Sequence, residues 1–106
     1  MTDYILAMST CPKQNALDIS KLLLESGKCA CVNIVPEVTS IYRWKGNVEV
    51  EEECILVIKS EAELENGLKT LLLKIHPYET PEFIVLKIES GSQQYLDWIS
   101  ASVSVN

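Results

Sequence analysis

The chain has 106 residues, of which 47% are hydrophobic and 23% charged, and its nine Lys and Arg against fifteen Asp and Glu give a formal net charge of −6 at pH 7. This composition fits one globular domain over residues 1–106 and excludes a disordered chain. The longest apolar runs fall far short of the ~20 residues of a membrane span. An acidic chain without a basic stripe is a poor ligand for nucleic acid or anionic lipid, so we expect no nucleic acid and no membrane among its partners.

The compartment is predicted from the first residues and from the cysteines. Met1 to Met8 lacks the basic segment and the long apolar run of a secretory signal, which predicts a cytoplasmic protein. In the reducing cytosol we interpret its four cysteines as thiols rather than as disulfides. They are Cys11, Cys29, Cys31 and Cys54.

The chain begins with a predicted strand and helix. Ile5 to Met8 is a short apolar run, typical of a strand that is buried on both faces. Ser9 to Pro12 is expected to be a turn that leads into a helix, because proline suits the first helical turn. From Lys13 onward apolar residues recur at helical spacing, and Gly27 ends the helix.

A long β-hairpin is predicted next. Cys29 to Val35 is rich in β-branched residues, and after Pro36 the segment Val38 to Trp44 is again typical of a strand. Lys45 to Asn47 is a hairpin signal, and Val48 to Lys59 forms the returning strand. Since strands are usually 5–6 residues long, this hairpin should project beyond the core of a small domain.

The second half of the chain repeats the pattern of helix and strand. Ser60 to Ile75 is predicted to be a helix, with Ser60 as N-cap and Glu63 completing a capping box. His76 to Pro81 is a loop bounded by prolines, and Glu82 to Ile88 is a strand. A last amphipathic helix carries Tyr, Leu, Trp and Ile at positions 95, 96, 98 and 99 and frays after about residue 101.

The resulting order, β-α-β-β-α-β-α, predicts an α+β fold: a ferredoxin-like split βαβ sandwich with a long hairpin between its second and third strands and an extra C-terminal helix. Ile5 to Met8, Ile55 to Ile58 and Phe83 to Leu86 are apolar on both faces, which is more than two helices on one face of the sheet can cover. A large apolar face usually marks an interface, so the chain is predicted to form a homo-oligomer.

Enzymatic chemistry has little support in the sequence. Phosphate-binding glycine motifs, a nucleophile elbow, a zinc-protease motif and paired CxxC motifs are all missing. An enzyme that used the single histidine, His76, as acid or base would need a second catalytic group, and the sequence nominates none. We therefore predict a protein that is not an enzyme, with no catalytic and no cofactor-binding residues.

His76 allows two interpretations. It could be a metal ligand or a polar anchor in a pocket, together with Tyr78 and Glu79 in the same loop. It could also be a histidine that interacts with the dipole at the C-terminus of the preceding helix. One imidazole does not specify a metal site, so the residues alone favour the second interpretation.

The cysteines and glutamates allow further alternatives. Cys29 and Cys31 could share a soft ion, although two small buried hydrophobic residues are the simpler interpretation. Cys11 is expected in the turn before a helix, where a thiol is exposed and reactive, or it is an idle turn residue. Glu49, Glu51 and Glu53 should share one face of the hairpin, where they would gather hard cations or simply be solvated. On this basis solvation is the stronger interpretation.

Several segments in order along the chain resemble the CutA family, the divalent-cation tolerance proteins. The matching segments are Ala30 to Asn33, Val35-Pro36, Val38 to Tyr42 with Trp44 to Gly46, Ile58-Lys59, His76 to Glu82 and Tyr95 to Trp98. The resemblance implies a homotrimer in which long hairpins extend the sheets of neighbouring subunits. It also implies a non-enzymatic role in tolerance of copper and other divalent metals.

The resemblance also suggests ligands for a weak site for Cu(II) or another divalent cation. His76 matches a histidine implicated in copper binding in bacterial members, whereas a second histidine found in some members is here Ile75. The family's cysteine near the end of the first strand is here Ser9. Cys11 could substitute for that cysteine, and Glu79 is a nearby carboxylate. The implied metal ligands are therefore His76, Cys11 and Glu79.

An alternative function follows from the likeness of this architecture to trimeric PII-type signalling proteins. In that case clefts between subunits would bind a small molecule or a protein partner, and metal contact would be incidental. Lys59, Arg43 and the loop at His76 are the polar groups to test. This alternative rests on analogy between folds.

Overall fold

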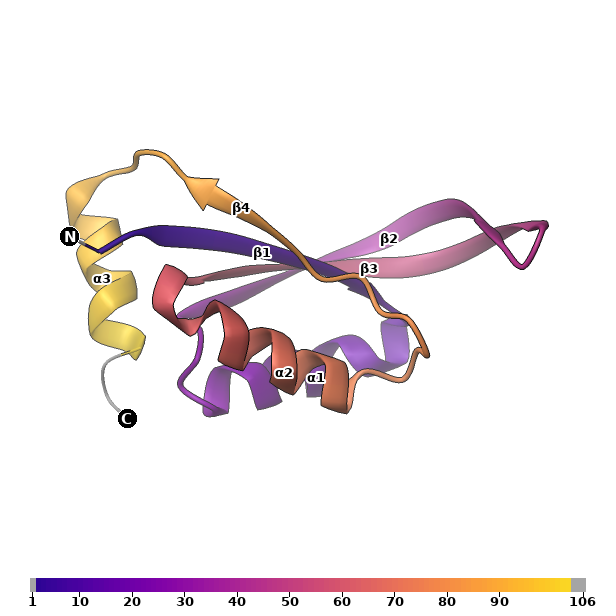
Figure 1. Cartoon of the computed structure of the whole chain (residues 1–106), viewed down its shortest axis with the longest axis horizontal. Helices are drawn as coiled ribbons and strands as arrows, with labels where there is room; N and C mark the ends of the chain where they lie inside the picture. Colours follow the sequence, from indigo (N-terminus) through magenta and orange to yellow (C-terminus); the bar gives the residue numbers. More distant parts are fainter. Residues whose placement is uncertain (1, 104–106) are drawn as a thin grey trace.

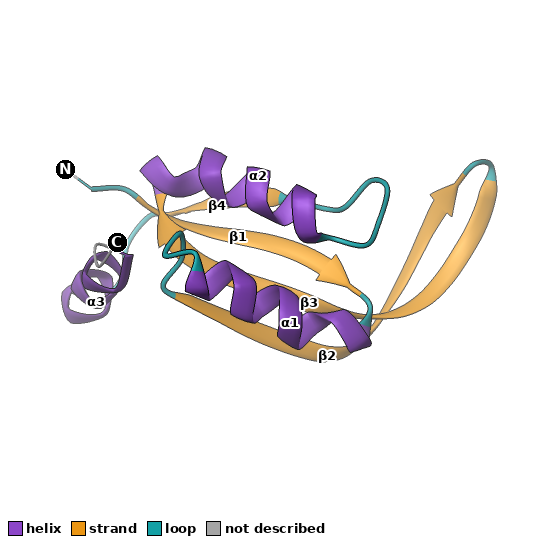
Figure 2. Ribbon diagram, turned by 90° about the horizontal axis from the view of Figure 1, so that it is seen from below, coloured by secondary structure: helices purple, strands orange, loops and turns teal. Residues whose placement is uncertain are grey.

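The computed structural model describes residues 2–103. Its elements are β1 (Tyr4–Cys11), α1 (Lys13–Glu25), β2 (Cys31–Trp44), β3 (Asn47–Glu61), a short 3-10 helix (Ala62–Leu64), α2 (Glu65–Ile75), β4 (Ile84–Ile88) and α3 (Gln93–Val103). The strands form one antiparallel sheet in the order β2-β3-β1-β4, and α1 and α2 lie side by side on one face of it, as Figures 1 and 2 show. This confirms the predicted ferredoxin-like α+β fold.

The core lies between this face of the sheet and the two helices. Ala7 of β1, Leu56 and Ile58 of β3, Leu23 of α1 and Leu72 of α2 are all fully buried there. Their spacing explains the elements, because apolar residues recur every second position in the strands and every third or fourth position in the helices. Within residues 2–103 no helix is long and apolar enough to span a membrane.

β1 runs from Tyr4 to Cys11, three residues past its predicted end at Met8. The segment that was expected to turn, Ser9 to Pro12, continues the strand through Cys11, because Ser9, Thr10 and Cys11 pair with β3. Pro12 alone makes the transition, with extended backbone angles, and α1 begins at the next residue. This correction changes the environment of Cys11, which belongs to the sheet rather than to an exposed turn.

The start of α2 also differs from the prediction. Ser60 does not cap a helix, since β3 runs on to Glu61 and pairs there with the beginning of β1. The Ser60 hydroxyl is fully buried and donates a 2.6 Å hydrogen bond to the carbonyl of Lys28. The capping box with Glu63 is therefore wrong, and an exposed Glu63 lies in the 3-10 helix instead.

The long hairpin of β2 and β3 is confirmed, although it runs from Cys31 to Glu61 rather than from Cys29 to Lys59 and its turn has two residues rather than three. Trp44 pairs with Asn47 across a two-residue turn in which Lys45 and Gly46 both have positive φ, 50° and 84°. This is the backbone combination of the tight turns that match the twist of antiparallel strands. The pairing shifts register between Val35 and Val38, where the sequence predicted an interruption at Pro36. The far half of the hairpin projects from the rest of the molecule (Figure 1). With the hairpin included, the molecule measures 45 × 25 × 22 Å.

The face of the sheet opposite α1 and α2 is largely apolar. Leu6 pairs with Leu86 and Met8 with Ile84 on this face, and Ile84 and Leu86 are 49% and 54% exposed. Within residues 2–103, α3 alone among the helices packs at one end of this face, where the Tyr4 hydroxyl bonds Ser100, which in turn donates to Glu61. The predicted large apolar face is therefore present in the single chain.

Candidate functional site

The loop after α2 is attached to the sheet through His76. His76 is the first residue beyond the helix, and its backbone N–H still bonds the carbonyl of Leu72. Its ring is buried, with 7% of the residue exposed. Nε2 lies 2.8 Å from the carbonyl oxygen of Thr10 and donates to it, while Nδ1 accepts a 3.1 Å hydrogen bond from the backbone N–H of Tyr78.

These two bonds define the protonation of the ring. A carbonyl can only accept, and a backbone N–H can only donate, so Nε2 carries the proton and Nδ1 presents its lone pair. Both nitrogens of His76 are therefore occupied by the protein itself. A metal ion could bind this imidazole only if the ring gave up Thr10 or Tyr78.

A second attachment joins the same loop to β3. The Tyr78 hydroxyl donates a 2.6 Å hydrogen bond to Oε2 of Glu53, a carboxylate that is only 6% exposed. Burial first, and then the bond to Glu53, raise the pKa of Tyr78 above its ordinary value. The Tyr78 ring also lies against His76, with centroids 4.7 Å apart. Glu53 and His76 thus hold Tyr78 between them.

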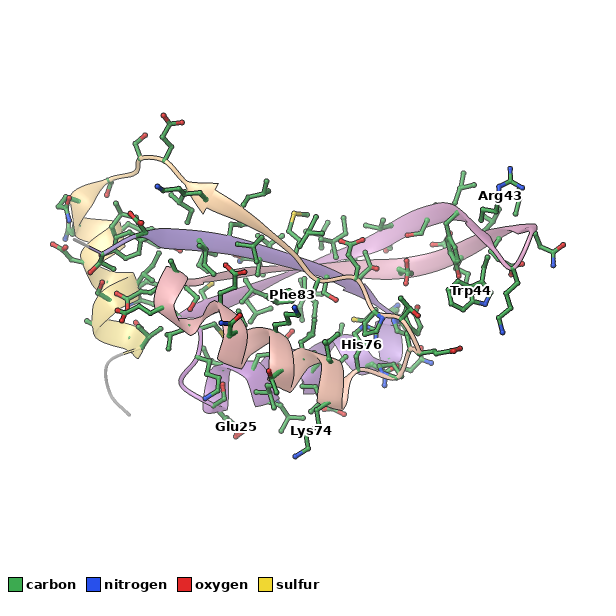
Figure 3. All side chains as sticks on the ribbon, viewed as in Figure 1. Glu25, Arg43, Trp44, Lys74, His76 and Phe83 are labelled. Carbon is green, nitrogen blue, oxygen red and sulfur yellow. The ribbon has the colours of Figure 1, made fainter. Side chains whose placement is uncertain are left out.

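The loop and the hairpin enclose an open cleft of about 790 Å³. Figure 3 shows His76 at the base of this region and Trp44 farther out along the hairpin. Five carboxylates contribute to the lining, and within the described part of the chain no Lys, Arg or His does so. The lining residues are Thr10, Ser40, Ile41, Tyr42, Trp44, Glu49, Glu51, Glu53, Pro77, Tyr78, Glu79, Thr80 and Glu82.

The carboxylates give the cleft a strongly negative potential. Desolvation, and then Glu51, raise the pKa of Tyr42. Desolvation, and then the charge of Glu53, raise the pKa of the Glu82 carboxyl. Both shifts are expected where like charges are gathered and partly shielded from water. The prediction that Glu49, Glu51 and Glu53 share one face of the hairpin is confirmed, although Glu53 is buried rather than solvated.

Cys11 is placed differently from the prediction. It is fully buried at the end of β1, and the reactive, exposed thiol that the sequence suggested is wrong. Burial, and then the charges of Cys54 and Glu53, raise the pKa of Cys11 to about 11. The thiol is therefore protonated at neutral pH, although α1 begins only two residues later.

The three predicted ligands do not form a ready metal site. Glu79 is exposed in the loop and lines the cleft, His76 is buried behind the loop, and Cys11 lies in the core. Among residues 2–103, no three His, Cys, Asp or Glu side chains are grouped so that they could hold a metal ion.

The other polar groups that the sequence suggested are dispersed. Arg43 lies near the tip of the hairpin (Figure 3), and Lys59 lies on the open face of the sheet, where it bonds Asn33. Cys29 precedes β2 and is buried in the core, where burial, and then Cys31, raise its pKa to about 12. Cys31 lies across from Lys59 on the open face. None of these side chains lines the cleft.

Sequence reasoning missed the pair formed by Tyr78 and Glu53. The two residues are 25 positions apart, and the run of glutamates is typical of a solvated strand. A weak signal was available, since Glu53 directly precedes the apolar run from Cys54 to Ile58 and therefore lies nearest the core. Its partner could be identified only once α2 placed the loop over the end of β1.

Comparison with known proteins connects this geometry to a family. A family model described as CutA1 divalent ion tolerance protein matches residues 5–102. The mouse protein named CutA is 39% identical over 94 residues, which are 88% of this chain and 53% of that protein. The divalent-cation tolerance protein CutA of Thermus thermophilus is 44% identical over 84 residues, 79% of this chain and 82% of its own length. The chain thus spans about half the length of its mammalian relatives and most of the bacterial one.

Solved structures agree with the fold. The protein from Nostoc, described as a PII-like protein CutA in apo form, superimposes with a TM-score of 0.89 at 33% identity and covers 100% of both chains. A protein from Archaeoglobus fulgidus, described as a periplasmic divalent cation tolerance protein CutA, also has a TM-score of 0.89 at 33% identity. It covers 98% of this chain and 100% of its own.

Proposed function

This chain belongs to the CutA1 divalent ion tolerance protein family, and we propose that it acts as a homotrimeric, non-enzymatic protein of divalent-cation tolerance. The observation that carries the proposal is the cleft beside the His76 loop, with five carboxylates in its lining. Carboxylate oxygens are the preferred ligands of hard divalent cations, and like charges in a partly desolvated cleft favour a bound cation. Residues 1–106 form one domain in this proposal.

The proposed ligands are Glu79, His76 and Cys11, and binding of Cu(II) or another divalent cation is weak. Glu79 is exposed and available. For His76 to bind, its ring must release Thr10 or the backbone of Tyr78, which leaves a polar group unsatisfied at a cost of ~1–3 kcal/mol. Removing the proton of Cys11 at pH 7 costs roughly 5 kcal/mol, since its pKa is about 11. These costs must be offset by the metal bonds.

The binding proposal is tested by calorimetric titration with Cu(II), with Zn(II) as the second metal. Glu79→Gln should weaken binding severalfold, and His76→Ala should abolish it. Glu89→Gln is the matched control, because Glu89 is exposed and lies outside the cleft. Circular dichroism checks that the His76 variant is folded. If both the Glu79 and the His76 variants gave the same heat of metal binding as the wild type, the assignment would be refuted.

The trimer proposal is supported by the open apolar face of the sheet. Leu86 on this face is 54% exposed, and the projecting hairpin leaves strand edges unpaired. Exposed apolar faces and free edges both favour association, and closed symmetric assemblies are the common outcome. We expect a particle of about 36 kDa, three times the 11.9 kDa chain.

Native mass spectrometry tests the trimer. Leu86→Glu should dissociate it, because three carboxylates would enter an apolar interface. Leu17→Glu is the matched control, since Leu17 is 57% exposed on α1, away from this face. A monomeric wild-type protein at micromolar concentration would refute the proposal, as would an intact trimer of the Leu86 variant.

A second candidate function is a PII-like sensor that binds a small molecule or a protein partner in clefts between subunits. It is favoured by the likeness to the Nostoc structure and by Tyr42, Trp44 and Tyr78 in the cleft lining. A ligand that binds only the native state raises the midpoint of thermal unfolding, so a metabolite screen by thermal shift separates this candidate from the first.

We further propose a cytoplasmic location, which cell fractionation tests.

A further inference from the structure

Two cysteines lie opposite each other on neighbouring strands of the sheet, and the proposed metal-tolerance function gives this pair no role. Cys11, the last residue of β1, is the direct partner of Cys54 in β3. Both side chains belong to the same buried cluster on the helix-covered face, and both are free thiols. Opposed residues of antiparallel strands have Cα atoms roughly 4.5 or 5.5 Å apart, and disulfides need about 4.4–6.8 Å. Strand pairing therefore places their Cα atoms within the range of separations that a disulfide spans.

We propose that Cys11 and Cys54 form a reversible thiol–disulfide pair, a redox modification site at the base of the hairpin. The other two cysteines are less well placed for this reaction. Cys29 lies in the core before β2 begins, and Cys31 lies on the opposite, open face of the sheet. Only Cys11 and Cys54 occupy opposed positions in the strand ladder within residues 2–103.

The oxidant in this proposal is a small aliphatic disulfide such as oxidised glutathione. One cysteine thiolate attacks a sulfur of that disulfide and displaces one small thiolate, which leaves a mixed disulfide on the protein. The second cysteine then attacks the protein sulfur of the mixed disulfide and displaces the other small thiolate. The two cysteines lose two electrons, the small disulfide gains them, and the two protons released from the cysteines end on the small thiols.

Access to the buried thiols requires local opening. Cys11 is the final residue of β1, and ends of strands open at a lower free energy than the core of a sheet. Its high pKa, about 11, makes the reaction slow at neutral pH. The pair is thus a site that responds to sustained oxidation rather than to brief exposure.

The location connects the pair to the cleft. Thr10 precedes Cys11 and accepts the hydrogen bond from His76, while Glu53 precedes Cys54 and accepts the one from Tyr78. Both anchors of the loop therefore lie one residue away from the pair. A disulfide between the two strands at this point would fix the distance between Thr10 and Glu53, the two residues that hold the loop.

The test equilibrates the full chain with oxidised glutathione in buffer that contains a chelator, so that the result does not depend on metal binding. We expect the number of thiols titrated in denaturant to fall from four to two, with a mass lower by about 2 Da, the two hydrogens lost. Peptide mapping without reductant should join the segments that contain Cys11 and Cys54. The oxidised protein should unfold at a higher temperature, because the bond closes a long loop.

Variants identify the pair. Cys54→Ser should keep all three of its remaining thiols, whereas the double variant Cys29→Ser with Cys31→Ser should still lose two. In a second arm the protein is refolded from urea in the same redox buffer, so slow access cannot explain a negative result. Retention of four thiols in both arms would overturn the proposal, and so would a bond mapped between Cys29 and Cys31.

Discussion

Replacing Tyr78 by Phe isolates one interaction of the cleft. The substitution removes the hydroxyl that donates a 2.6 Å hydrogen bond to Glu53 and leaves the ring that packs on His76. Hydrogen bonds to charged groups contribute ~1.5–3 kcal/mol, and the loss leaves a nearly buried carboxylate without this partner. We therefore expect the free energy of unfolding at pH 8 to fall by about 2 kcal/mol.

The size of this effect should depend on pH in a defined direction. Burial, and then the bond to Glu53, raise the pKa of Tyr78 above the value of ~10 that tyrosine has in an unfolded chain. Above pH 10 the unfolded state therefore binds fewer protons than the native state, and wild-type stability falls as the pH rises. Between pH 10 and pH 11 the wild type loses up to ~1.4 kcal/mol of stability in this way, whereas the variant lacks the hydroxyl and loses none of it. The difference between the two proteins should then shrink to roughly 0.6 kcal/mol.

Urea unfolding followed by circular dichroism measures both quantities at one protein concentration, at pH 8 and pH 11. Tyr95→Phe is the control at pH 8, since the Tyr95 hydroxyl makes no hydrogen bond within residues 2–103. Its effect should stay within about 0.5 kcal/mol. Equal stability of wild type and Tyr78→Phe at pH 8, or a gap that stays constant up to pH 11, would refute the reasoning.

Three further predictions concern individual residues. Ser60→Ala should lower the free energy of unfolding by about 1–3 kcal/mol in urea, because the carbonyl of Lys28 loses the 2.6 Å hydrogen bond from the fully buried Ser60 hydroxyl, and an unchanged midpoint would contradict this. Gly46→Ala should cost about 1 kcal/mol through its φ of 84°, visible as a lower thermal midpoint, since nothing lies within 4 Å to add a clash. Iodoacetamide at pH 8 should alkylate Cys11 roughly a hundredfold more slowly than a free thiol, by mass spectrometry of its peptide; a free-thiol rate would show that its pKa is not raised to about 11.

The element types were predictable because each has a local period. The apolar positions of α2, Leu68 and Leu72, lie one turn apart and both are fully buried. The hairpin turn was equally local, since Lys45 and Gly46 take the positive φ angles by themselves. Local patterns of this kind survive in the folded chain because the tertiary contacts of these residues, such as those of Leu68 and Leu72 in the core, agree with them.

The two largest errors in the element boundaries have one origin, the ladder between β1 and β3. It extends β1 through Cys11 at one end and β3 through Glu61 at the other. Strand hydrogen bonds are made with a distant segment, and a proline or a good N-cap nearby does not reveal them. Ser9 to Cys11 and Ser60 therefore look like a turn and a cap when only their neighbours in sequence are considered.

The candidate site shows the same division. The importance of His76 was visible from its position as the single histidine in a loop bounded by prolines. The tautomer of His76 could not be predicted from the sequence, because the carbonyl that accepts the ring proton belongs to Thr10, 66 residues away. Nor could the sequence distinguish Glu53, which is buried beneath Tyr78, from the exposed Glu51 beside it.

The sequence by itself determined the order and type of the elements, the ferredoxin-like topology that follows from them, and the surplus of apolar faces. Tertiary structure decided how far each strand runs, which carboxylate is buried, and which groups hold His76 and Cys11. The physical reason is the distance along the chain over which each interaction acts. Periodicity and turn conformation depend on neighbours in the chain, whereas strand hydrogen bonds and desolvation depend on segments that meet only when the chain folds.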